Sequence, residues 1–504
     1  MTKNGMMMQY FHWYYGNNNN DPDLWDKVKQ EASRLSKLGV TALWLPPAFK
    51  GSSFNPDGKN AYEKYGVGYG IYDLYDLGEF NQNGTIRTKY GNKEQYLAAI
   101  QESQACHIDI YADVVFNHKA GADETEWVKA ARVGWDDRNF VIEDEVWIEA
   151  WTRFLFTGRD NAYSDFKWCF RHFDGVDFAN NLGKEDANGI FKFQGMGKDW
   201  EKMVSDEKGN YDYLMFSDID MNSPEVRTEL ARWGKWFLET TKVNGFRLDA
   251  VKHIQFSFFR DWIRFLKKAY PRLFFVGEYW SPDLGRLNNY IEKTQGCMSL
   301  FDAPLQNNFY QASRTPDGGY DMRGILDHTL MKENPQLAVT LVDNHDTQPC
   351  QALEHWVDWW FKPLAYSIIL LRQEGYPSVF YPDFYGAEYE DKGCKIKLLP
   401  VDGIEKLMIA RKLYAHGIQH DYFDDQNTIG WTREGDPGDA RSGAAVLLTN
   451  RTAASKWMMM GKQHAGRQLV DFLENSQKTT MVNPYGWALF HVNDGSVSVW
   501  VFKN

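Results

Sequence analysis

Eight short runs of apolar or β-branched residues recur along the first 385 residues, and longer stretches with helical periodicity separate them. Several runs are continuous rather than alternating, which is typical of parallel strands buried on both faces. Eight strands with intervening helices predict an α/β fold, a (β/α)8 TIM barrel, which needs about 250 residues. The predicted strands are 6–13, 40–45, 108–116, 243–248, 273–276, 298–301, 338–342 and 378–381, and the clearest predicted helices are 24–38, 93–102, 224–243, 256–270 and 361–372.

The chain has 504 residues, more than a barrel requires, and the surplus falls in two places. Residues 118–223 lie between the third and fourth strands and are rich in Asp, Trp, Gly and Asn, so we predict a loop-rich β domain inserted after the third strand. Residues 409–504 show short alternating runs separated by turns, which predict a C-terminal antiparallel β-sandwich domain. The barrel domain then comprises 1–117 and 224–408.

Composition narrows the class of ligand. Lys and Arg total 56 and Asp and Glu total 68, a formal net charge of −12, which disfavours binding to nucleic acid or to an anionic membrane. The aromatic residues, 20 Trp, 27 Tyr and 32 Phe, offer flat platforms for the apolar faces of sugars. No apolar run reaches the ~18 residues of a membrane span. The five cysteines form no C-x-x-C pair, and Gln9 and His12 interrupt the first apolar run, so we expect a cytoplasmic protein without a signal peptide.

Carboxylates follow the predicted strands at the points where the strands end. Asp249 comes after the fourth run, Glu278 after the fifth and Asp346 after the seventh, with Arg247 and His345 beside them. A single Asp at such a place commonly caps the following helix. Several together meet at the C-terminal face of a barrel, where the reacting groups lie. Convergent carboxylates without a nucleophilic Ser or Cys indicate glycoside hydrolysis.

Neighbouring residues suggest a role for two of the carboxylates. Arg247 lies two residues before Asp249 and points the same way from a strand, so it should keep Asp249 ionised, as a nucleophile requires. Glu278 follows an apolar stretch and precedes Tyr279 and Trp280, which should raise its pKa and suit it to be the general acid.

Four segments at these strand ends resemble the signature regions of the α-amylase family of glycoside hydrolases, and the similarity extends over nearly the whole chain. The segments are Asp-Val-Val-Phe-Asn-His at 113–118, Gly-Phe-Arg-Leu-Asp-Ala-Val-Lys-His at 245–253, Glu-Tyr-Trp at 278–280 and Val-Asp-Asn-His-Asp at 342–346. The chain looks most similar to the bacterial liquefying members and their cytoplasmic relatives. The resemblance implies that Asp249 is the nucleophile, Glu278 the acid/base and Asp346 a third carboxylate that grips substrate hydroxyls. It also implies a set of substrate-binding residues, namely Tyr69, His118, Arg247, Lys252, His253, Trp280 and His345.

Members of this type bind calcium between the barrel and the inserted domain. The resemblance implies that Asn117, Asp212, Asp218 and the His253 carbonyl bind one calcium ion, through the oxygen ligands that calcium prefers. It assigns Asp174, Asp199 and Asp220 to a neighbouring sodium and second-calcium cluster. This chain has Asn222 where the family has another Asp, so the second calcium and the sodium stay open.

The resemblance therefore implies retaining endo-hydrolysis of α-1,4-glucosidic bonds in starch, glycogen and maltodextrins. Glu278 would protonate the glycosidic oxygen while Asp249 forms a covalent glycosyl-enzyme, with the two carboxyl groups about 5–5.5 Å apart. One alternative is a sibling activity of the family, transglycosylating or maltooligosaccharide-forming. A second is a non-catalytic glucan-binding protein, which would usually lack one of the three carboxylates. We expect an α-glucan as the only partner and a monomer.

Overall fold

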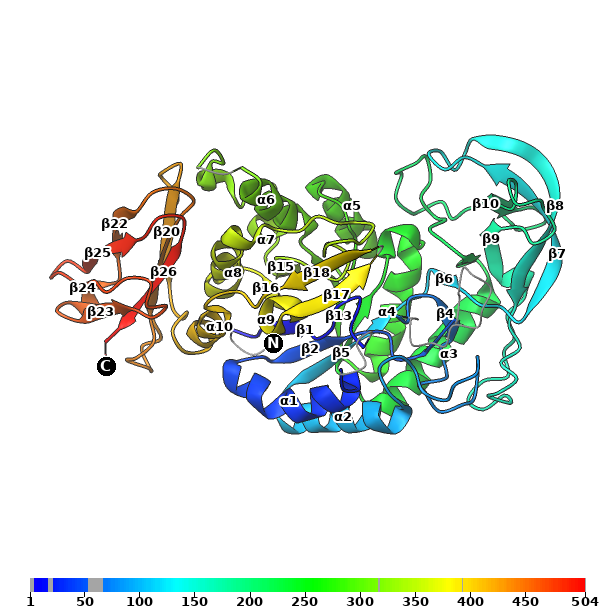
Figure 1. Ribbon diagram of the computed structural model, residues 1–504, viewed down its shortest axis with the longest axis horizontal. Coiled ribbons are helices and arrows are strands. Elements are labelled where there is room, and N and C mark those ends of the chain that lie inside the picture. The colour runs from blue at the N-terminus through cyan, green and yellow to red at the C-terminus, as the bar shows by residue number, and fades with distance from the viewer. Residues whose placement is uncertain (1–3, 17–20, 53–66, 316–317, 392, 504) are drawn as a thin grey trace.

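The computed structural model describes residues 4–16, 21–52, 67–315, 318–391 and 393–503, and its centre is a closed barrel of eight parallel strands (Figure 1). The strands follow one another around the barrel in chain order, and the last pairs with the first to close it. Each predicted apolar run overlaps one barrel strand, so the (β/α)8 prediction is confirmed. The strands are β1 (Met7–Gln9), β2 (Ala42–Leu45), β5 (Asp109–Val114), β12 (Gly245–Leu248), β13 (Phe274–Gly277), β14 (Ser299–Phe301), β15 (Ala338–Leu341) and β16 (Tyr376–Phe380).

Helices cover the outside of the barrel, and most bury one face against it. The helix α8 (Lys362–Leu371) is buried almost all round, because it packs between the barrel and the C-terminal region, where the carbonyl of Leu371 accepts hydrogen bonds from Trp431 and Arg433. No helix in the described ranges is both long enough and apolar enough to cross a membrane. The remaining helices are α1 (Leu24–Leu38), α2 (Lys93–Ala105), α3 (Pro224–Thr241), α4 (Phe256–Ala269), α5 (Leu284–Thr294), α6 (Ala303–Ser313), α7 (Leu330–Glu333), α9 (Tyr381–Tyr385) and α10 (Ile404–Leu413).

A six-stranded antiparallel sheet lies between the third and fourth barrel strands in the chain, at the opposite end of the molecule from the C-terminus in Figure 1. Its strand order is β6, β11, β9, β10, β7, β8, and the two longest strands, β7 and β8, form a ribbon at one edge. The strands are β6 (His118–Lys119), β7 (Glu124–Val133), β8 (Val141–Arg153), β9 (Phe173–Phe178), β10 (Asn188–Phe193) and β11 (Ser217–Ile219). A short pair, β3 (Lys50–Gly51) and β4 (Ile71–Asp73), precedes them.

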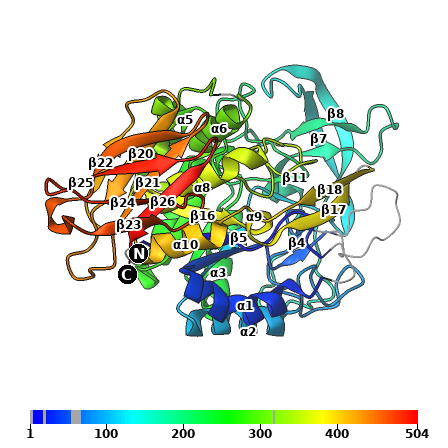
Figure 2. The ribbon, with the colours of Figure 1, turned by 60° about the vertical axis from the view of Figure 1, so that its left-hand side comes forward.

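The last region of the chain forms a β domain with antiparallel sheets, as the sequence predicts, beside α8 and α10 (Figures 1 and 2). Trp500 and Met458 belong to a separate hydrophobic core within it. A six-stranded sheet has the order β19, β20, β21, β26, β23, β24, and β22 pairs with β25. The strands are β19 (Gln419–Tyr422), β20 (Thr428–Arg433), β21 (Ala444–Thr449), β22 (Ala454–Met459), β23 (Gln468–Asp471), β24 (Thr479–Met481), β25 (Trp487–Val492) and β26 (Val497–Phe502).

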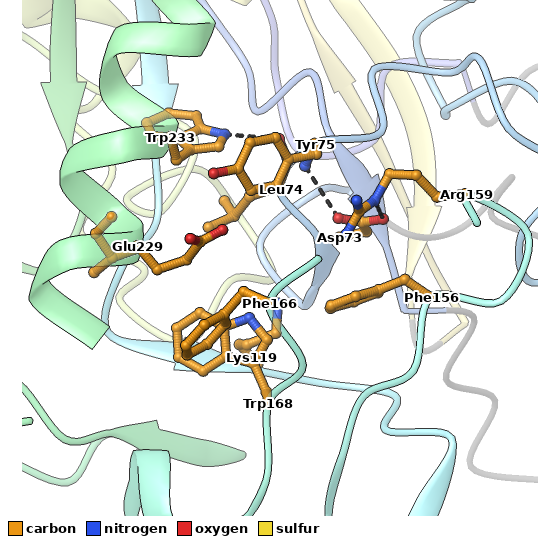
Figure 3. Close-up of a pocket in the computed structure, with 11 residues that line it drawn as sticks. Asp73, Leu74, Tyr75, Lys119, Phe156, Arg159, Phe166, Trp168, Glu229 and Trp233 are labelled. Atoms are coloured by element: carbon orange, nitrogen blue, oxygen red, sulfur yellow. Dashed lines mark hydrogen bonds and ion pairs between the residues drawn. The ribbon is translucent and has the colours of Figure 1, made fainter. Parts of the chain in front are cut away.

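A buried junction joins the inserted region to the barrel, shown in Figure 3. Arg159, from the loop after β8, donates to the carboxylate of Asp73 at the end of β4, with Nε and Oδ2 2.7 Å apart and both side chains about 1% exposed. The ammonium of Lys119 lies 5.4 Å from the ring centre of Phe156 and 5.2 Å from that of Trp168. Burial lowers the pKa of Lys119 to about 7. The junction therefore contains buried ionisable groups whose desolvation is offset by their contacts with one another.

Replacing Arg159 by Met should lower the stability of the protein by about 3 kcal/mol, because the buried Asp73 carboxylate would lose the cation that it pairs with. It would keep the neutral donors Gln82 and Tyr75. The measurement is thermal unfolding followed by circular dichroism. The matched control is Arg132→Met, since Arg132 pairs with an Asp186 side chain that is 69% exposed, and exposed ion pairs contribute less than about 1 kcal/mol. Equal losses in the two variants would contradict the role assigned to the junction.

Candidate active site

Four strands of the barrel bring carboxylates to its C-terminal end. Asp113 is the second-last residue of β5, Asp249 follows β12, Glu278 follows β13, and Asp346 lies in the turn after β15. The register places Arg247 of β12 directly beside Asp113 of β5. Because the strands are parallel, their C-terminal ends share one face of the barrel, and the side chains converge there.

The guanidinium of Arg247 connects three of these carboxylates. Its Nη1 lies 2.8 Å from Oδ1 of Asp113 and 2.6 Å from Oδ1 of Asp249, and its Nη2 lies 2.9 Å from Oε2 of Glu278. The side chain is fully buried. The sequence predicts that Arg247 keeps Asp249 ionised, but the same cation also contacts Glu278, and burial outweighs its effect, because the pKa of Asp249 is raised to about 7.

Asp113 connects Arg247 to two aromatic side chains of the site. It accepts hydrogen bonds from Nε1 of Trp44 (2.9 Å) and from the hydroxyl of Tyr69 (2.7 Å), both to Oδ2, while its other oxygen contacts Arg247. Burial raises the pKa of Asp113, and the attraction of Arg247 opposes that rise. Asp113 is not among the predicted site residues. Its position at the start of the 113–118 signature segment is the feature of the sequence that could have identified it.

Stacked rings form one wall of the site. The rings of Tyr69 and His345 are 5.1 Å apart and nearly parallel, and Trp13 stacks on Tyr69 at 5.7 Å. His345 Nδ1 is 3.0 Å from Nε2 of Gln9. Burial and then the charge of Arg247 hold the pKa of His345 well below its usual range, so this ring is neutral near pH 7.

The four carboxylates differ in their electrostatic surroundings. Burial raises the pKa of Asp249 to about 7; the charges of Glu278 and Asp113 add to the rise, and Arg247 opposes it. Burial and the nearby charge of Glu278 raise the pKa of Asp346 well above its usual range. Oε2 of Glu278 also accepts the backbone N–H of Ala250 at 3.1 Å, which fixes the orientation of that carboxyl group.

The other predicted substrate residues fall into two groups. His118 lies beside Tyr69, with Nε2 2.8 Å from the Tyr69 carbonyl. A second group follows β12 and β13: Lys252 donates to the Trp280 carbonyl at 3.0 Å and contacts Glu207 at 2.8 Å. His253 Nδ1 lies 2.7 Å from the Tyr211 carbonyl. The inserted segment thus supplies backbone and acidic partners that position this second group.

A buried acidic cluster lies between the inserted region and the barrel, and it could hold a metal ion. Ligand oxygens of Asp174, Glu201 and Asp212 all lie within 4.8 Å of one another. Within the described ranges, both carboxylate oxygens of Asp174 and Oδ2 of Asp218 accept no hydrogen bond. Burial, with repulsion among the carboxylates, raises the pKa of all four groups well above the usual range. Buried carboxylate oxygens without a hydrogen-bond donor suit a hard cation such as calcium.

The remaining predicted metal ligands are arranged differently. Asn117 joins the cluster, because its Nδ2 lies 3.3 Å from Oδ1 of Asp218. Asp199 instead pairs with Lys192, at 2.5 Å, with a largely exposed side chain. Glu201, two residues later, takes the buried position. Glu201 is not among the predicted metal ligands. The feature of the sequence that could have identified it is a second acidic side chain in the same Asp-Trp-Glu segment.

A lysine ammonium lies against the predicted second-cation residues. Nζ of Lys198 is 2.7 Å from Oδ2 of Asp220 and 4.0 Å from Oδ1 of Asp174, and it donates to the carbonyls of Arg171 and Phe173 at 2.8 Å. Of these, Asp220 and Asp174 are residues that the resemblance assigns to the second-cation cluster, and both already lie beside the lysine ammonium. The residues present therefore fit one divalent ion better than two.

Comparisons with known proteins agree with the barrel and its C-terminal domain. The family model described as "Alpha amylase, catalytic domain" matches residues 12–397, and "Alpha-amylase C-terminal" matches residues 445–501. The chain is 56% identical to an alpha-amylase of Geobacillus stearothermophilus, over 99% of this chain and 87% of that protein. It is 44% identical to the cytoplasmic alpha-amylase of Escherichia coli, over 99% of both chains. A solved alpha-amylase of Anoxybacillus matches with a TM-score of 0.63 at 16% identity, covering 99% of this chain and 96% of that one.

Proposed function

Because the chain belongs to the α-amylase family of glycoside hydrolases, we propose that Asp249, Glu278 and Asp346 carry out its hydrolysis of α-1,4-glucosidic bonds. The family reaction is retaining hydrolysis. The observation that most supports the assignment is the guanidinium of Arg247, which contacts Asp249 through one nitrogen and Glu278 through the other. A shared cation holds the nucleophile and the acid on neighbouring strands at a fixed separation, as a double-displacement reaction requires.

The reaction has two chemical steps. In the first, an oxygen of Asp249 forms a bond to the anomeric carbon as the glycosidic bond breaks, and Glu278 gives its proton to the departing oxygen. In the second, Glu278 takes a proton from water, whose oxygen displaces Asp249 and restores both carboxyl groups. The bond from the Ala250 N–H to Oε2 leaves Oε1 of Glu278 to carry the proton. Asp346, beside His345, would hold the sugar hydroxyls, and the ring of Tyr69 would stack under the sugar.

The substrates we propose are starch, glycogen and maltodextrins, cleaved within the chain. Internal cleavage lowers the viscosity of starch long before reducing ends accumulate, and retention releases the α-anomer first, which proton NMR detects. A narrow set of maltooligosaccharides from the earliest time points, or transfer products, would instead favour a sibling activity. If the protein neither hydrolyses nor transfers any α-glucan, the non-catalytic glucan-binding alternative would be favoured.

The acid limb of the pH profile should report Asp249. Its pKa is raised to about 7, and the nucleophile must be ionised, so kcat/KM should fall about tenfold per pH unit below that value. The measurement uses a short blocked maltooligosaccharide across pH 4.5 to 8.5, with circular dichroism at each pH to confirm that the protein stays folded. A profile that stays flat down to pH 5 would contradict the assignment.

We further propose that one calcium ion binds the acidic cluster of Asp174, Glu201, Asp212 and Asp218, with Asn117 and the His253 carbonyl as neutral ligands. Calcium there would neutralise the carboxylates and hold the inserted domain (118–223) against the barrel domain (1–117 and 224–408), with 409–504 as the third domain. The cytoplasmic relative from Escherichia coli supports a cytoplasmic location, and we propose that the enzyme acts as a monomer.

A further inference from the structure

The β7–β8 ribbon exposes several tryptophans that the reaction does not use. Two of the tryptophans in the inserted segment, Trp168 and Trp200, are buried. By contrast, Trp127 is 57% exposed, Trp147 is 60% exposed and Trp151 is 41% exposed. Large apolar side chains gathered at one exposed place usually mark a binding surface.

The strand register puts these three indoles on one face. Trp151 is opposite Thr125, Trp127 is opposite Glu149, and Trp147 is opposite Lys129. Residues two apart on a strand share a face, so Trp147, Trp127 and Trp151 lie on one face of the ribbon in three successive cross-strand pairs. The distance along the strand from Trp147 to Trp151 is about 14 Å. The other face carries the buried Val128, Ala130, Ile148 and Ala150. We call the three indoles the tryptophan stripe.

The backbone at one end of the tryptophan stripe is linked by hydrogen bonds to strands that carry active-site residues. The carbonyl of Trp151 accepts the hydroxyl of Ser217 at 2.9 Å. Ser217 lies in β11, which pairs with β6, where Asp218 is opposite His118. His118 contacts Tyr69 at the sugar-binding wall. The strands β7 and β8, which carry the stripe, lie at the outer edge of the molecule in Figure 1.

The surroundings of the tryptophan stripe favour a neutral, flat partner. Strands β7 and β8 together carry six carboxylates against three basic side chains, Lys129, Arg132 and Arg153, and this net negative charge disfavours nucleic acid and anionic membranes. Pairing with the edge strand of a second copy is hindered, because Asn180 and Asn181 already bond the backbone of β8 at Trp147 and Glu149. Sugar rings have apolar faces that stack on indoles and hydroxyls that bond to flanking polar groups.

We propose that the tryptophan stripe binds a segment of α-glucan outside the catalytic cleft and so holds polymeric substrate on the enzyme. This inference rests on the proposed function, because the polymer it binds is the polymer the site cleaves. Three indoles over about 14 Å match a run of a few glucose units, and the Trp151 end is the one whose backbone is linked to the active-site strands.

The test is the variant Trp127→Ala/Trp147→Ala, made both in the active chain and in an Asp249→Asn chain that does not consume the ligand. Binding is measured as retardation in native gels that contain soluble starch. We expect starch to bind about tenfold more weakly, because two stacking faces are lost. In the active chain, kcat/KM on a short blocked maltooligosaccharide should not change, while KM on starch should rise. The aromatic variant Trp127→Phe/Trp147→Phe should keep most of the retardation, and Ile142→Ala, an exposed apolar residue of β8, should keep all of it.

Two results would overturn the proposal. One is unchanged starch retardation in the double alanine variant. The other is a wild-type dimer in size-exclusion chromatography that the same variant dissociates, which would make the face a contact between copies. Hydrolysis of the short substrate by the wild-type chain is scored separately, so its absence would refute the proposed function without being confused with either result.

Discussion

Replacing Asp249 by Asn should lower starch hydrolysis by roughly 10⁴-fold or more, because the amide cannot form the glycosyl-enzyme. The two side chains have nearly the same shape, and the amide oxygen can still accept from Arg247, which contacts Oδ1 at 2.6 Å in the native protein. The variant also removes a buried carboxylate whose pKa is already raised, so folding should not suffer. Turnover is measured by reducing-end release, and glucan binding by retardation in starch gels.

Glu278→Gln provides the contrast that separates the two roles. Loss of a general acid should cost about 10²–10⁴-fold on starch, whose leaving oxygen needs a proton. A glycosyl fluoride has a leaving group that departs without protonation, so the glutamine variant should still release fluoride in the first step. The Asp249→Asn variant should fail on both substrates. If the fluoride results were reversed between the variants, the nucleophile and acid assignments would have to be exchanged.

The fold was predictable because each barrel strand is a short apolar run with its own boundary. The predicted run 6–13 shows the limit of that reasoning, since β1 ends at Gln9 and the next aromatic residues pack around the site, with Trp13 stacked on Tyr69. The hairpin of β17 (Ala387–Asp391) and β18 (Cys394–Leu398) was not predicted at all. Its strands alternate charged residues, with Glu388 opposite Lys397, and a search for apolar runs does not detect them.

The site was predictable as far as the strand ends determine it. Residues that directly follow parallel strands must share one face, and this places Asp249, Glu278 and Asp346 together. Contacts between strands are not encoded in one strand's sequence, so the link from Arg247 to Glu278 required the structure. The same holds for Glu201, which lies in a loop without periodicity, where sequence alone did not distinguish it from Asp199.

Removing calcium should produce the second large effect, a fall in the unfolding temperature of about 5 °C. A ligand that binds only the folded state stabilises it by about 4 kcal/mol when the free ligand concentration is 1,000 times its Kd. Removing the ligand removes that stabilisation. The buried cluster makes this loss larger than usual, because without a cation Asp174, Glu201, Asp212 and Asp218 repel one another where water cannot screen them.

The experiment compares unfolding temperatures with a chelator and with added calcium for the native chain and two variants. Asp212→Asn removes a buried oxygen of the cluster and should abolish most of the calcium-dependent difference. Asp199→Asn is the matched control, since Asp199 pairs with Lys192 and is largely exposed, so the difference should persist. Calorimetric titration should give one calcium per chain, because Lys198 already occupies the oxygens of Asp220, Arg171 and Phe173. A stoichiometry of two would contradict the single site. Loss of the response in Asp199→Asn alone would show that the ion is held by the exposed acidic residues instead.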